Sequence, residues 1–69
     1  MLSPAASDID TARFDLGDAE AYIVRADSSD GAAAAALKQF AIESLQRARK
    51  ILQKAEKQLE NELYQSSAE

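Results

Sequence analysis

The sequence contains no cysteine, no histidine and no tryptophan, and its 69 residues include only one proline and two glycines. Without cysteine, neither a disulfide nor a thiolate metal site can support the fold. Without histidine, a nucleophile–base pair would have to be built from Ser, Lys, Tyr and carboxylates alone. A chain this short can hardly enclose a pocket that would tune such carboxylates for catalysis. We therefore expect a protein that is not an enzyme and has no catalytic residue, cofactor or metal site.

The sequence also lacks targeting and membrane signals. Its first residues, MLSPAAS, have neither a basic region nor an apolar core, so we expect no secretory signal peptide. No stretch approaches 18 consecutive apolar residues, which excludes the usual pattern of a membrane-spanning helix. Cytoplasmic localisation is the expectation, although a cargo exported by a signal-independent route would look the same.

The second half of the chain has the composition of one long helix. From Ala32 to Gln65 it has no glycine or proline, only two β-branched residues, and many Ala, Leu, Lys, Gln, Glu and Arg residues, which favour helix. Ser28, Ser29 and Asp30 precede it, and each can accept hydrogen bonds from the free N–H groups of a first turn. The sequence predicts a turn with its N-cap over residues 27–31, a long amphipathic helix over residues 31–65 and a flexible tail over residues 66–69.

Apolar residues of this segment form a stripe with spacings of three and four. The stripe is wide, as is typical of a helix in a bundle. Part of it repeats every eleven residues, which predicts a nearly straight helix without the left-handed supercoil of a heptad repeat. Its members are Leu37, Ala41, Leu45, Ala48, Leu52, Ala55, Leu59 and Leu63.

Five consecutive alanines, residues 32–36, open the predicted helix. Alanine favours helix because it loses no side-chain entropy. It also allows another backbone to approach closely. Both interpretations, helix initiation and a close helix crossing, remain open from the sequence.

The first half of the chain is ambiguous. After a predicted flexible tail at residues 1–7, residues 8–26 have apolar positions at alternating threes and fours, and Ser7 with Asp10 resembles a capping box, so we prefer a helix. The alternative is a β-hairpin around Gly17, which is unfavourable inside a helix and suits a tight turn.

The length of the predicted long helix indicates a partner. Thirty-four helical residues span about 51 Å, whereas a compact domain of this size has a diameter of about 28 Å. A helix over residues 8–26, folded back, covers only the half of the long helix nearest the turn. We expect an all-α helical hairpin that is completed into a bundle by association with a protein partner or a second copy. The expected partner-binding residues belong to the stripe or, for Ile51, to its shoulder: Leu45, Ile51, Leu52, Leu59 and Leu63.

Charge is distributed in blocks. Residues 1–36 hold seven acids and two arginines, or −5; residues 37–57 hold six basic and two acidic residues, or +4; and residues 58–69 hold three acids, or −3. The blocks predict pairing between the two segments or between chains. An acidic net charge of −4 and the lack of a nucleic-acid-binding motif argue against nucleic acid as the partner.

Together, these features favour a small helical interaction module, such as an adaptor, a chaperone or a structural subunit of a larger assembly. The alternative is a regulator that acts, through its charged segments, on nucleic acid or on a nucleic-acid-binding protein. A salt titration of binding separates these two functions, because electrostatic binding weakens as salt is added whereas apolar packing does not.

A substitution on the stripe tests this interpretation. We predict that Leu52→Asp dissociates the assembly, because it places a charge among apolar contacts, whereas Lys50→Asp leaves it intact. Light scattering measures the mass of each variant. An unaltered mass for Leu52→Asp would show that the stripe is not the interface.

Overall fold

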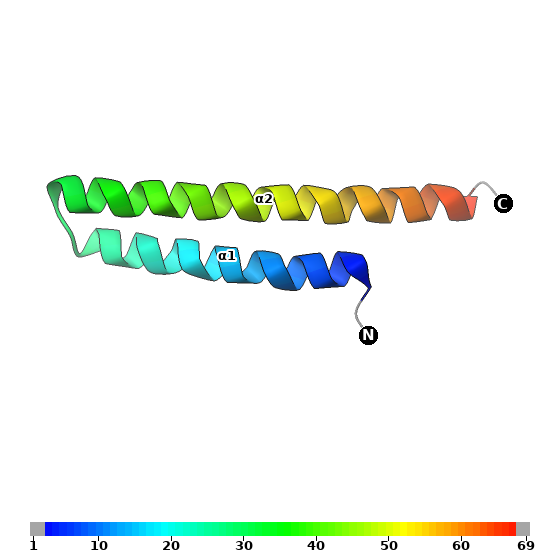
Figure 1. Ribbon diagram of the computed structural model, residues 1–69, viewed down its shortest axis with the longest axis horizontal. Coiled ribbons are helices and arrows are strands. Elements are labelled where there is room, and N and C mark those ends of the chain that lie inside the picture. The colour runs from blue at the N-terminus through cyan, green and yellow to red at the C-terminus, as the bar shows by residue number, and fades with distance from the viewer. Residues whose placement is uncertain (1–2, 68–69) are drawn as a thin grey trace.

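The computed structural model describes residues 3–67 and contains two antiparallel helices in a single hairpin (Figure 1). Helix α1 spans Pro4–Asp27 and helix α2 spans Gly31–Ser67. The described residues include no strand. The expected all-α helical hairpin is confirmed, and α1 runs unbroken through Gly17, so the β-hairpin alternative is wrong.

Helix α1 begins earlier than the sequence predicted. Ser3 is the N-cap, its Oγ accepting a hydrogen bond from the Ala6 N–H at 3.2 Å, and Pro4 occupies the first turn, where its fixed φ and missing N–H are tolerated. Most of the segment predicted as a flexible tail, residues 1–7, is therefore helical, and the capping box at Ser7 is not used. Residues 1 and 2 lie outside the described part of the chain.

The serines of the turn cap the C-terminus of α1 and do not act as N-caps of α2. The Ser28 and Ser29 N–H groups donate to the Arg25 and Ala26 carbonyls, and the Ser29 hydroxyl donates to the Arg25 carbonyl at 2.9 Å. These serines, predicted as N-caps of the long helix, thus satisfy the last carbonyls of α1. Gly31 starts α2 with φ of +58°, a left-handed conformation in which a side chain would be strained.

Small residues at intervals of seven form the contact between the helices, which we call the alanine seam. In α1 the buried residues are Ala5, Ala12, Ala19 and Ala26. In α2 they are Ala41, Ala48 and Ala55, with Ser44 buried between the first two. A heptad of small side chains lets two helix backbones approach closely and keeps the same face of each helix toward the other.

Three side-chain contacts define the register of the seam. Asp8 lies beside Lys54, Asp15 beside Arg47, and the ring centroid of Tyr22 lies 5.6 Å from that of Phe40. Successive contacts lie seven residues later in α1 and seven residues earlier in α2, because the helices are antiparallel. Burial in α2 therefore follows a repeat of seven, and the eleven-residue repeat noted in the sequence does not describe it.

Alanines rather than leucines occupy the centre of the contact. Phe40 and Leu45, which lie in the half of α2 that runs beside α1, are each nearly half exposed. In the run at residues 32–36, only Ala34 is partly covered and the other four alanines are exposed. The run thus acts mainly through helix propensity, and the close crossing is made by the alanines at seven-residue intervals.

The hairpin is long, flat and one helix thick. Its extents are 58 × 21 × 11 Å, and its radius of gyration is 16.5 Å, against about 11 Å for a compact domain of this length. Helix α2 has 37 residues and α1 has 24, so α2 extends about 20 Å beyond the start of α1 (Figure 1). The first residue of α1 and the last residue of α2 both lie away from the turn, and both broad faces are open to solvent.

The alanine seam predicts a position-specific effect of enlarging a side chain. Ala12 is fully buried, so Ala12→Leu overpacks the seam and lowers the free energy of unfolding by about 1–3 kcal/mol. Circular dichroism at 222 nm during urea denaturation measures this loss. Ala21→Leu is the matched control, because Ala21 is exposed on the same helix and Leu is a good helix former. Equal effects of the two substitutions would contradict the seam.

Candidate functional site

The two broad faces of the hairpin differ in chemistry. On one face, acids of α1 meet basic residues of α2: Asp15 Oδ1 lies 3.4 Å from Arg47 Nε, and Asp8 Oδ1 lies 3.7 Å from Lys54 Nζ. The pairing of acidic and basic segments within the chain is thereby confirmed for these residues. We call this side the charged face.

Arg47 links the charged face to the seam. Its Nη2 donates to Ser44 Oγ at 3.0 Å, while its Nε donates to Asp15 Oδ1. Ser44 is fully buried, so this hydrogen bond satisfies the one buried hydroxyl of the seam in the described chain. Asp15 has only 18% of its side chain exposed and depends on Arg47 for its charge partner. Asp8 is less well satisfied, because its Oδ2 is buried without a hydrogen-bond partner.

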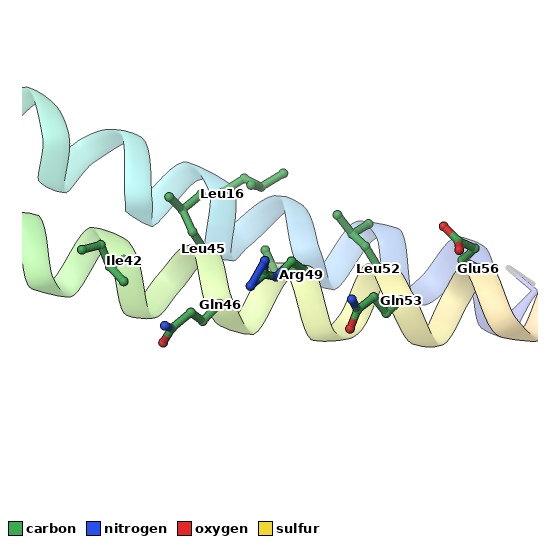
Figure 2. Close-up of a pocket in the computed structure, with 9 residues that line it drawn as sticks. Leu16, Ile42, Leu45, Gln46, Arg49, Leu52, Gln53 and Glu56 are labelled. Atoms are coloured by element: carbon green, nitrogen blue, oxygen red, sulfur yellow. The ribbon is translucent and has the colours of Figure 1, made fainter.

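The opposite face carries large aliphatic side chains. An open groove of about 640 Å³ lies there, and its apolar lining includes Leu16 from α1 and Leu45 and Leu52 from α2. Figure 2 shows Leu45 and Leu52 extending from α2 on the side toward α1, while Gln46 and Gln53 extend the other way. Arg49 and Glu56 also line the groove.

Residues one heptad away continue this surface in both directions along the hairpin. Ile9 and Ile23 flank Leu16 in α1, and Leu59 follows Leu52 in α2. Each of these side chains is between 38% and 51% exposed. Exposed apolar residues are ordinary when scattered, whereas these residues form a continuous row on one face. We call this surface the apolar face: Ile9, Leu16, Ile23, Leu45, Leu52 and Leu59.

The partner-binding residues expected from the sequence do not all lie on one side of α2. Leu45, Leu52 and Leu59 belong to the apolar face, and Leu63 is exposed farther along the overhang of α2. Ile51 lies one heptad after Ser44, in the column that packs toward α1, and is only partly exposed. The structure therefore brings four of the five expected residues to one side of α2 and separates Ile51 from them.

The sequence interpretation missed the contribution of α1 to this face. Ile9, Leu16 and Ile23 recur at intervals of seven, each four residues after Ala5, Ala12 and Ala19. An alanine repeat in step with an aliphatic repeat is a signal that the alanines face the neighbouring helix and the larger residues lie beside it. That signal is present in the sequence, but the ambiguity between helix and hairpin hid it.

Other site types find no support in the described chain. Across residues 3–67 no group of three or more acidic side chains is placed to hold a metal ion, and neither helix in that range has a stretch apolar enough to cross a membrane. Comparison with protein-family models, curated proteins and solved structures finds no match to this chain. The apolar face is therefore the feature from which function must be argued.

The position of Arg47 predicts its contribution to stability. Arg47→Ala leaves Asp15 without its charge partner and the buried Ser44 hydroxyl oxygen without its donor, so we predict a loss of about 1 kcal/mol in the free energy of unfolding. Urea denaturation at one fixed protein concentration measures it. Lys50→Ala removes the same sign of charge from an exposed position and should leave stability unchanged. If both variants lose the same stability, the Arg47 contacts do not stabilise the hairpin.

Proposed function

We propose that this protein is a small helical protein–protein interaction module that binds its partner through the apolar face. An adaptor, a chaperone and a structural subunit of a larger assembly are the roles that fit such a module. The observation that carries the proposal is the row of half-exposed aliphatic side chains along one side of a hairpin that is only one helix thick.

The energy available on this face is sufficient for association. A fully buried large aliphatic side chain contributes about 1.5–3 kcal/mol. Because its six side chains are between 38% and 51% exposed, covering them would contribute roughly 4–8 kcal/mol before the entropy of association is subtracted. Over residues 3–67 the two helices form a single layer, and no second layer covers these side chains.

Helix packing is the mode of binding that suits the face. Its leucines recur every seven residues along α2, which is the spacing that presents one side of a helix to another helix. A partner helix lying in the groove beside Leu16, Leu45 and Leu52 would cover both helices of the hairpin at once.

The alternative, a regulator acting on nucleic acid or on a nucleic-acid-binding protein, rests on the charge blocks alone. In the hairpin, two residues of the basic block, Arg47 and Lys54, already lie beside acids of α1. Such pairing reduces the positive charge that phosphates could neutralise. No observation favours this alternative over the apolar face.

Site-specific photo-crosslinking tests the proposed function without assuming the identity of the partner. We predict that a benzophenone amino acid at position 52 gives a protein adduct in the cell that makes this chain, because position 52 lies on the apolar face. The same amino acid at position 50, on the polar side of α2, should give none. Gel electrophoresis followed by mass spectrometry detects and identifies the adduct. No adduct from position 52, or equal yields from both positions, would refute the proposal.

A further inference from the structure

Helix α2 carries a second heptad pattern beside the alanine seam. Seven residues follow one another at spacings of three, four, three, four, three and four: Ile42, Leu45, Arg49, Leu52, Glu56, Leu59 and Leu63. All seven are exposed. Five are large and apolar, and the pattern includes the three leucines that α2 contributes to the apolar face. We call these positions the outer seam, because this spacing is the one by which a helix packs along another helix.

The outer seam is self-complementary when it is read in the opposite direction. Leu52 lies at its centre, Arg49 and Glu56 lie on either side, and both ends are apolar. If a second α2 lies antiparallel, with a two-fold axis near Leu52, each apolar end meets an apolar end. Arg49 of each copy then lies near Glu56 of the other, so the dimer contains two such pairs of opposite charge.

We propose that the outer seam is covered by a second copy of this chain, antiparallel, to form a four-helix bundle with a two-fold axis that crosses α2 near Leu52. This inference rests on the proposed function, since it names the occupant of the same apolar face. A two-fold dimer uses one surface patch twice, so the patch must complement itself. The order of charges in the outer seam meets that requirement.

The other face-to-face arrangement, with the two-fold axis parallel to the helices, suits the charges less well. That axis places α1 of one copy opposite α2 of the other at the same level along the hairpin. Since Asp15 lies beside Arg47 and Asp8 beside Lys54, Arg13 lies at about the level of Arg49. Arg49 of each copy would then lie near Arg13 of the other, which already pairs with Asp10 at 3.4 Å, so this arrangement is less favourable than one that pairs Arg49 with Glu56.

The unequal helix lengths favour the same axis. Helix α2 extends beyond the start of α1, and this overhang carries Leu63, with Leu59 where it begins. An axis parallel to the helices leaves the overhang without an α1 opposite it, because α1 of the second copy ends at the same level. An axis across α2 near Leu52 reverses the second hairpin, and its helices then run along the overhang and cover Leu59 and Leu63.

Charge exchange between Arg49 and Glu56 tests the proposal on the purified chain. We expect the unaltered protein to sediment as a dimer, twice the 7.5 kDa chain mass. R49E and E56R should each raise the dimer dissociation constant by at least about tenfold, because each turns both interchain pairs into like charges. The double variant R49E/E56R should recover most of the affinity, and an equimolar mixture of the two single variants should form the heterodimer preferentially. Analytical ultracentrifugation over a range of concentrations measures each constant.

K50E is the matched control, since it makes the same charge change one residue away on an exposed, polar side of α2. It should leave the dissociation constant within about twofold, and circular dichroism should show every variant to be as helical as the parent. The proposal is overturned if the unaltered chain remains a monomer up to millimolar concentration, if the double variant is weaker than both single variants, or if the mixture does not form the heterodimer.

These outcomes are distinguishable from failure of the proposed function. A monomeric chain whose position 52 crosslinks to a different protein overturns the second copy as occupant and leaves the interaction module standing. A monomeric chain that gives no adduct from position 52 overturns both. An adduct of twice the chain mass, containing only this sequence, supports both.

Discussion

Close contact between small side chains is the constraint on which this hairpin depends. Ala12 and Ala19 of α1 and Ala41, Ser44 and Ala48 of α2 are almost completely buried, and their small size lets the two helices pack backbone to backbone. The same contact buries little apolar volume, because alanine contributes one methyl group. The larger aliphatic residues are displaced to the flank of the seam, where two helices alone cannot enclose them.

The two faces of the hairpin follow from that displacement. On one flank, acids of α1 reach basic residues of α2, and these ion pairs define the register between the two helices. On the other flank, the aliphatic residues of both helices gather into the apolar face. A flat layer with one charged side and one apolar side has the form of half a bundle, in which the apolar side is where a second layer adds most stability. The function proposed for this chain and its proposed second copy both arise from this asymmetry.

Much of the architecture was predictable from local sequence features. The absence of glycine and proline after Gly31 indicated the long helix, and the serines and aspartates before it indicated the turn. Two expectations for the first half of the chain were wrong for local reasons. Gly17 suggested a break, but the helix continues through it. Ser7 with Asp10 resembled a capping box, whereas Ser3 and Pro4 form the N-terminus of α1. Of the candidate site, the three leucines of α2 were expected from the sequence, whereas the isoleucines and Leu16 of α1 were not, because their role depends on where α1 lies.

The long helix α2, the turn before it and the excess length of α2 follow from the sequence alone, because propensity, capping and rise per residue act over a few neighbouring residues. The choice of which residues of α2 face α1 does not follow from the sequence alone. Along α2, alanines and leucines share one apolar stripe that is compatible with repeats of seven and of eleven. Only contact with a second helix carrying alanines every seven residues selects the alanines for the interior and leaves the leucines outside. That selection is a property of two surfaces fitting together, so it emerged only in the folded hairpin, and with it came the apolar face.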